Sequence, residues 1–265
     1  MSYYSATEPM SSRVDDRPNR ARARLQEAKK ALYREAILAA AEAVFAEHGY
    51  EAAKVQAIAE LGGVSLATFY ATFPKKWDVY RALQSMRLRA LMQEVGTRVM
   101  QATDTFERLR CGIEGYLRFH MAHPAFLRLQ LRERVPWGTT DDLRTPEQTR
   151  AWESGLQMLM AAFRDGIREG LFVAEDPELC ARTATAMSQV RLALWVDGAP
   201  EARESPDVVA HRTMQQFIRA FASEARRGEL LARLDASPWS PASSSALLDE
   251  DEVDPLVLQP TRRGK

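Results

Sequence analysis

The strongest constraint on the fold of this chain lies in residues 34–80, where short helical patterns follow one another with glycine breaks between them. The first pattern predicts an amphipathic helix over 34–48, because its apolar residues recur at the spacing of one helical face. Gly49 is the expected end of that helix, since glycine adopts the left-handed C-terminal conformation without strain. The positions on this face are Ile37, Ala41, Val44, Phe45 and His48.

Two shorter helices are expected directly after it, over 54–61 and 66–73. Gly62 and Gly63 permit a tight turn between them, and Ser65 is a favourable N-cap for the second of the two. Two short helices joined by a glycine-containing turn form a helix-turn-helix, whose second helix enters the major groove of DNA. The segment therefore predicts a DNA-binding domain.

This segment resembles the DNA-binding domain of the tetracycline-repressor (TetR) family of bacterial regulators. The resemblance covers roughly 34–80 and is carried, in order and spacing, by Ile37, Leu38, Ala40, Ala41, Phe45, Gly49, Tyr50, Val55, Ile58, Ala59, Gly63, Val64, Ser65, Thr68, Phe69, Tyr70, Phe73 and Lys76. It implies a homodimer, joined through a four-helix bundle made by the last two helices of each chain. It also implies a double-stranded DNA operator and a small-molecule effector as partners.

The segment departs from the family pattern at several positions. Ala53 and Lys54 stand where the family usually places threonine or serine, so the side-chain cap of the second helix is lost, although Lys54 can still contact a phosphate. Ala67 replaces a common glycine, and Ala71 and Thr72 stand where bulkier groups often reach bases. Such a small, apolar face favours thymine methyl groups and groove shape over guanine edges.

Two sets of DNA contacts are expected from these positions. The residues assigned to phosphates are Thr68, Tyr70, Lys76 and Lys54, and the residues assigned to bases are Gln56, Leu66, Ala67, Ala71 and Thr72. The N-cap Ser65 is also expected to belong to the DNA-binding surface. A basic segment precedes the domain, with six basic residues and one acidic residue between Arg17 and Lys30. Its arginines Arg20, Arg22 and Arg24 are expected to contact the minor groove or phosphates, with a merely solubilising role as the alternative.

Composition is compatible with a cytoplasmic protein of two domains. The 265 residues are 46% hydrophobic, which is enough for a sizeable core, and the formal net charge of zero argues against general coating of nucleic acid. No stretch of about 18 apolar residues predicts a membrane span, and the N-terminus lacks the apolar core of a secretion signal. Cys111 and Cys180 have no paired spacing, as expected in a reducing compartment.

Helical patterns continue to about residue 235 with no competing strand pattern, so we expect an all-α protein of about nine helices. Four regions are predicted: a disordered basic arm (1–33), the DNA-binding domain (34–80), a helical ligand-binding and dimerisation domain (81–235) and a disordered tail (236–265).

The last two predicted helices, 179–196 and 205–221, carry apolar residues on more than one side. Burial within one subunit is one interpretation, and a dimer interface is the other, because a helix that is apolar on two sides must bury both. Periodicity assigns Leu194 and Phe217 to the outer, dimer-forming side.

Residues 104–170 are expected to enclose a mostly apolar cavity of roughly 300–1,000 Å³ for a small molecule. The large side chains that predict it are Tyr116, Phe119, Met121, Phe126, Trp152, Met158 and Phe163. His120 and Arg128 are candidate polar anchors, although large residues at helical spacing are equally explained by core packing and arginines by a solvated face. His120 and His123 share a helical face, but no acidic or cysteine partner stands at a telling spacing, so no metal site is expected.

The function expected from these features is a ligand-responsive transcriptional repressor. It would bind a near-palindromic operator as a homodimer and be released by a hydrophobic or amphipathic small molecule. A constitutive DNA-binding or protein-recruiting module is the main alternative. A helical enzyme is disfavoured, because the sequence offers no Ser-His-Asp order, phosphate loop or carboxylate–histidine cluster, and no cofactor is expected.

Overall fold

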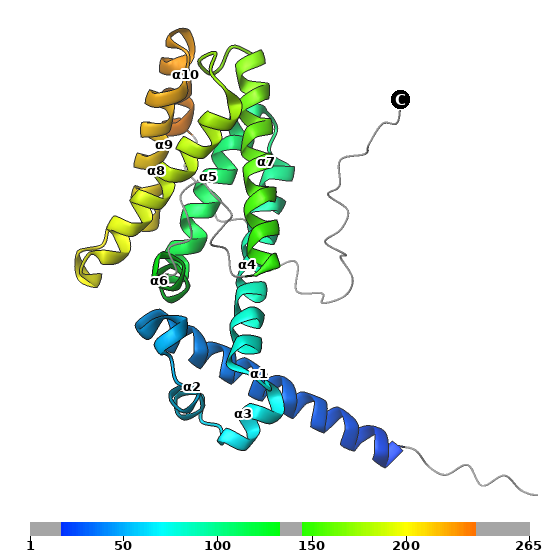
Figure 1. Cartoon of the computed structure of the whole chain (residues 1–265). Helices are drawn as coiled ribbons and strands as arrows, with labels where there is room; N and C mark the ends of the chain where they lie inside the picture. The colour runs from blue at the N-terminus through cyan, green and yellow to red at the C-terminus, as the bar shows by residue number, and fades with distance from the viewer. Residues whose placement is uncertain (1–16, 133–144, 237–265) are drawn as a thin grey trace, which may run out of the picture.

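The computed structural model describes residues 17–132 and 145–236 of the chain, and in these residues the protein is helical without a strand (Figure 1). The all-α fold class is confirmed. The helices are α1 (Arg17–Ala52), α2 (Val55–Leu61), α3 (Leu66–Thr72), α4 (Lys76–Gln101), α5 (Thr105–Ala122), α6 (Pro124–Arg132), α7 (Pro146–Arg168), α8 (Pro177–Asp197), α9 (Pro206–Phe221) and α10 (Glu224–Ala236), with a short 3-10 turn at Pro200–Ala202. The disorder predicted for 1–16 and 237–265 lies outside the described residues.

Among the described helices, none has the length and apolar character needed to cross a membrane.

Helix α1 begins earlier than the sequence pattern predicts. The segment 17–33, expected to be part of a disordered arm, forms its first turns. Arginine, alanine, leucine, glutamate and lysine dominate this stretch and are all strong helix formers, so nothing in the sequence stops the helix there. The predicted break at Gly49 is confirmed, since this residue has φ of 75° and interrupts the helix before a final turn.

The turn between α2 and α3 follows the local sequence closely. Gly63 has φ of 63°, a conformation that L-residues with side chains rarely adopt, and a Cβ atom on Gly62 would lie 3.1 Å from the carbonyl oxygen of Ile58. The Ser65 side chain caps α3 by accepting from the backbone N–H of Thr68 at 3.0 Å, as predicted. The Lys54 side chain makes no capping bond to α2, which confirms the expected loss of that cap.

One hydrophobic core holds the three N-terminal helices together. Phe45 of α1, Phe69 of α3 and Tyr80 of α4 are completely buried in it. Burial of a side chain such as that of Phe69 contributes about 1.5–3 kcal/mol, which fixes α3 on α1 and leaves its opposite face outward. Leu129 of α6 is also completely buried in this core. The predicted domain limit at residue 80 falls within α4, which continues as one helix into the second half of the protein.

A second core joins α5 to α10. Phe217 lies in it with 1% of its surface exposed, so its assignment to an outer, dimer-forming side is wrong.

Helix α10 is absent from the nine helices predicted. Only two residues, neither of them proline or glycine, separate it from α9, and six of its thirteen residues are charged. Leu230 and Leu234 bury its narrow apolar stripe, and Arg233 pairs with Asp104 at 2.7 Å.

Candidate DNA-binding surface and buried cavity

The outward face of α3 is small and largely apolar. Leu66 is 41% exposed and Tyr70 is 50% exposed, and the methyl side chains of Ala67 and Ala71 lie on the same exposed face. The hydroxyl of Thr72 donates to its own helix at the Thr68 carbonyl oxygen, 2.8 Å away. The structure thus places Leu66, Ala67, Tyr70 and Ala71 outward on one surface and Thr72 half-buried beside it.

Two polar side chains at the start of α3 are engaged with each other. The Ser65 hydroxyl lies 2.9 Å from the Thr68 hydroxyl, as well as accepting from the Thr68 backbone. Two further candidates, Lys54 and Gln56, are exposed at the beginning of α2. The beginnings of α2 and α3 are therefore both accessible to solvent, like the outward residues of α3.

Lys76 is placed differently from the expectation that it holds a phosphate. Its ammonium donates to the carbonyl oxygens of Tyr50, Glu51 and Ala53, at 2.7, 3.1 and 3.0 Å. An ammonium has three donors, and these three carbonyls at the end of α1 use them all. Lys76 therefore ties the start of α4 to the end of α1 and has no donor left for DNA.

The basic segment lies on the first half of α1. Arg22 and Arg24 are exposed there, and Arg20 belongs to the same helix although its side chain is outside the described residues. In Figure 1 this half of α1 extends beyond α3 and away from the remaining helices. The arginines are thus presented on a projecting helix, in place of the disordered arm expected from the sequence.

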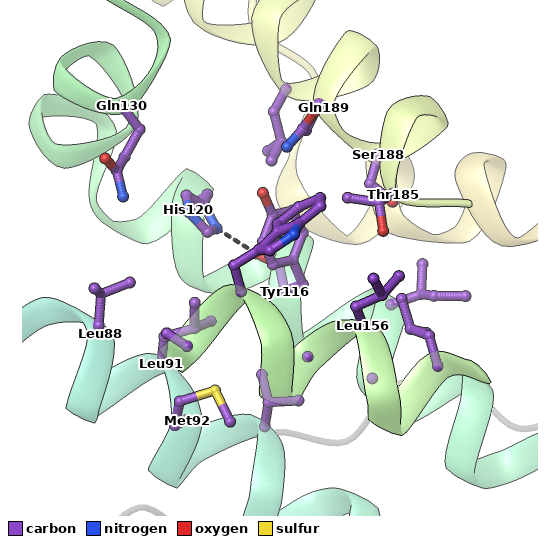
Figure 2. A pocket seen from close by; sticks show the side chains of 18 of the residues that line it. Leu88, Leu91, Met92, Tyr116, His120, Gln130, Leu156, Thr185, Ser188 and Gln189 are labelled. Atoms are coloured by element: carbon purple, nitrogen blue, oxygen red, sulfur yellow. Dashed lines mark hydrogen bonds between the residues drawn. The ribbon is translucent and has the colours of Figure 1, made fainter. Parts of the chain in front are cut away.

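The second half of the protein contains a cavity of about 190 Å³, lined by residues of α4, α5, α6, α7 and α8 (Figure 2). It is smaller than the cavity expected from the sequence. Four of the candidate ligand residues line it, namely Tyr116, His120, Trp152 and Met158. Figure 2 shows His120 and Tyr116 of α5 between the apolar residues of α4 on one side and Gln189, Ser188 and Thr185 of α8 on the other.

The other candidate ligand residues lie elsewhere. Phe119 and Phe126 pack with Leu88 and Leu91 in a small core cluster. Of these four residues, the two phenylalanines do not line the cavity. Phe163 and Met121 are buried in the second core, and Arg128 is exposed on α6. Whether a large side chain lines the cavity or packs in a core depends on which face of its helix it occupies. The spacing of residues within one helix does not show which face will meet the cavity.

The sequence prediction, which covered 104–170, missed the contributions of α4 and α8 and the glutamines of α6 and α7. Thr185, Ser188 and Gln189 of α8 line the cavity, as do Gln148 of α7 and Gln130 of α6. The available signal was the occurrence of polar residues within the otherwise apolar stretch of α8. Buried polar side chains inside an apolar helix need partners, and a cavity is one place to find them.

The ring of His120 has a defined protonation state. Its Nδ1 lies 2.9 Å from the carbonyl oxygen of Tyr116, and because a carbonyl only accepts, Nδ1 carries the hydrogen. Burial lowers the pKa of His120 to about 4, so the ring is neutral at pH 7. Burial also raises the pKa of Tyr116 to about 12, and its hydroxyl interacts with the Gln189 side chain.

The candidate metal pair does not form a site in the structure. His123 Nδ1 bonds the Phe119 carbonyl oxygen at 2.8 Å, as His120 does with Tyr116, so each ring is held by its own helix. Within 17–132 and 145–236, no three histidine, cysteine, aspartate or glutamate side chains are grouped so as to hold an ion.

A helix-turn-helix with an outward second helix, followed by an all-helical domain around a cavity, defines a DNA-binding transcription regulator. Residues 37–83 match the family profile described as bacterial regulatory proteins, tetR family. The HTH-type transcriptional repressor SCO4008 of Streptomyces coelicolor is 30% identical over 141 residues, which make up 53% of this chain and 68% of that protein. The chain belongs to the TetR family.

Two further similarities extend this result. The HTH-type transcriptional activator FasR of Mycolicibacterium smegmatis is 34% identical over 83 residues, 31% of this chain and only 38% of FasR. The solved structure of the ketosteroid transcriptional regulator KstR2 of Mycobacterium tuberculosis superposes with a TM-score of 0.63 at 20% identity, covering 72% of this chain and 95% of that one. This last similarity concerns the fold alone.

Proposed function

We propose that this TetR-family regulator is a ligand-responsive repressor that binds a near-palindromic operator as a homodimer. A small molecule in the cavity lowers its affinity for that operator. The proposal rests mainly on one observation, which is that a single short helix, α6, takes part in both the cavity and the DNA-binding domain.

Helix α6 has one face on each of the two regions. Leu127, Gln130 and Leu131 line the cavity. Leu129, between them in sequence, is completely buried in the core around α1 and α3. Because packed cores have low compressibility, a ligand that displaces the cavity face of α6 must also displace Leu129.

Helix α4 provides a second connection. Its first turns bury Val79 and Tyr80 in the DNA-binding core, whereas Leu88 and Leu91 line the cavity. The Arg87 guanidinium also pairs with buried Glu42 of α1, with Nη2 2.7 Å from Oε2. A shift of α4 is therefore transmitted to α1, and it moves α3 as part of the same rigid unit.

Dimerisation is proposed through α8. This helix presents an exposed apolar stripe that includes Leu179, Val190 and Leu194, the last of them 68% exposed. Exposed apolar side chains at helical spacing favour burial against a second copy of the same surface, which gives a twofold-symmetric dimer. Two α3 helices about 34–36 Å apart would then reach successive major grooves, and the operator would be a near-palindrome.

The DNA contacts proposed for each subunit follow from exposure. Tyr70 and Lys54 contact phosphates, while Leu66, Ala67 and Ala71 face the bases, where methyl groups favour thymine. Arg22 and Arg24 on the projecting half of α1 add phosphate contacts outside the helix-turn-helix.

The test has two stages, beginning with selection of bound genomic fragments by the purified full-length protein. Small apolar molecules are then screened for release of a labelled operator. The Gly155→Leu variant places a side chain at the cavity wall on α7, and it should bind the operator normally but resist release. The Gly96→Leu variant, on α4 outside the wall, should respond like the original protein.

Two results would count against this proposal. Release that is identical in the Gly155→Leu and Gly96→Leu variants would mean that the effector acts elsewhere. Operator binding that no small molecule alters would favour the constitutive DNA-binding alternative.

A further inference from the structure

The geometry points to a specific class of effector: an uncharged, mainly apolar alcohol whose hydroxyl donates a hydrogen bond to His120. This inference rests on the proposed function, because it names the ligand of the same cavity. It is carried by the hydrogen-bonding state of His120 and of two hydroxyl groups in the cavity wall, all three of which can only accept from a ligand.

The acceptor on His120 is its Nε2 atom. Nδ1 is committed to the Tyr116 carbonyl oxygen, so the neutral ring has its lone pair on Nε2. No residue in the described part of the chain is a partner of Nε2. The ring belongs to the cavity wall, with its centroid 4.3 Å from that of the Tyr116 ring. A ligand at this position must therefore bring a hydrogen to His120.

The two hydroxyl groups of α8 also act as acceptors toward the cavity. Thr185 donates its hydrogen to the Ala181 carbonyl oxygen at 2.9 Å, and Ser188 donates to the Ala184 carbonyl oxygen at 3.1 Å. Each hydroxyl has a single hydrogen, so only oxygen lone pairs remain available to a ligand.

Two glutamine oxygens reinforce this pattern. Oε1 of Gln189 and Oε1 of Gln130 are buried, have no hydrogen-bond partner in the described structure, and belong to cavity-wall residues. A buried acceptor without a partner is costly, so rotation of either amide toward the cavity would let a donor on the ligand satisfy it. The phenol of Tyr116 supplies a donor in return, and a hydroxyl both donates and accepts.

The wall also lacks the charges that an acid or an amine would need. None of the described residues that line the cavity is aspartate, glutamate, lysine or arginine. Burying an ionised carboxylate or ammonium without an opposite charge is strongly unfavourable. A carboxylate also cannot satisfy Nε2 of His120, because a carboxylate only accepts hydrogen bonds.

The size of the cavity sets the probe. Its volume of about 190 Å³ corresponds to roughly six water molecules at about 30 Å³ each. We therefore choose four compounds with the same six-carbon chain: 1-hexanol, hexanoate, hexylammonium and hexane. Their binding to the full-length protein is measured by calorimetry without DNA, so that ligand class is tested separately from operator release.

The expected result is that 1-hexanol binds at least about tenfold more tightly than hexanoate or hexylammonium at pH 7. The His120→Phe variant keeps a ring of similar size but removes the acceptor. It should weaken 1-hexanol binding by about three- to tenfold and leave hexane binding unchanged. The His123→Phe variant is the matched control, because His123 makes the same bond to its own helix but is not part of the wall.

Three outcomes would overturn the inference. Hexanoate or hexylammonium binding as tightly as 1-hexanol would refute an uncharged ligand. Equal 1-hexanol affinity in the His120→Phe and His123→Phe variants would refute the role of His120, and a Gln189→Met variant repeats the test if His120→Phe does not fold. Failure of all four compounds to bind would refute a small ligand in this cavity. Binding of 1-hexanol without operator release would instead contradict the proposed function and leave the ligand class intact.

Discussion

The Lys76 ammonium donates to the Tyr50 carbonyl oxygen at 2.7 Å and also lies 4.6 Å from the centroid of the Tyr50 ring. One side chain of α4 thus holds both the backbone and the side chain of a residue at the end of α1. Loss of these charged hydrogen bonds in Lys76→Ala should lower the free energy of unfolding by about 1–3 kcal/mol. Denaturant titration measures this change.

The Lys76→Ala variant also tests whether Lys76 contacts DNA or only stabilises the fold. Because Lys76 has no donor left for a phosphate, Lys76→Ala should leave the salt dependence of operator binding unchanged. Lys54→Ala should do the opposite, with stability retained and a salt slope reduced by about one. A reduced slope in Lys76→Ala at full stability would restore Lys76 as a phosphate contact.

Adjacent residues of α3 give a second pair of contrasting variants. Tyr70→Ala should weaken binding to all DNA sequences alike while the thermal midpoint stays within about 2 °C of the original, since Tyr70 is half-exposed. Phe69→Ala should cost about 3–5 kcal/mol of stability, because Phe69 is completely buried. The measurements are gel-shift affinity on specific and random DNA, and thermal denaturation. Full affinity of a folded Tyr70→Ala protein would exclude Tyr70 from the interface.

The projecting half of α1 can be tested without removing it. Replacing Arg20, Arg22 and Arg24 by glutamine keeps the helix propensity but removes three charges. Operator affinity should fall, most strongly at low salt, and the free energy of unfolding should not change, because Arg22 and Arg24 are exposed. An unchanged salt slope would show that these arginines only solubilise the protein.

Leu194 and Phe217 should now give different results, although periodicity places them on the same outer side. Leu194→Glu puts a charge on the exposed stripe of α8 and should yield a folded monomer. Phe217→Glu puts a charge in the second core and should unfold the chain. Sedimentation and circular dichroism distinguish the two. A folded Leu194→Glu dimer would move the proposed interface away from α8.

Acid should destabilise the protein through His120. Burial lowers the pKa of this residue to about 4 from an ordinary value of 6.5, so between these pH values the unfolded chain binds a proton that the folded chain does not. Stability is therefore lost as the pH falls through this window, by about 3 kcal/mol at pH 4.

The His120→Phe variant should lack this component, and His123→Phe should keep it. Burial raises the pKa of Glu114, which acts in the opposite direction. Glu114 is present in both variants, so its contribution cancels in the comparison. Equal pH dependence in the two variants would show that His120 does not carry the effect.

The sequence by itself determined the local features of this protein. The Gly49 break, the turn at Gly63 and the Ser65 cap depend on backbone conformation and on contacts within a few residues, which residue type fixes directly. The start of α9 after Ser205 follows for the same reason. These features were sufficient to predict the helix-turn-helix and the all-α fold class.

Only the tertiary structure decided which face of each helix meets which neighbour. Lys76 reaches carbonyls more than twenty residues away, and the residues that line the cavity come from five helices between Leu88 and Leu192. Phe217 and Leu194 have similar patterns but opposite environments. Helical periodicity identifies apolar faces, but the rotation and packing of one helix against another depend on the whole core, and these set both the cavity and the surface left for a partner.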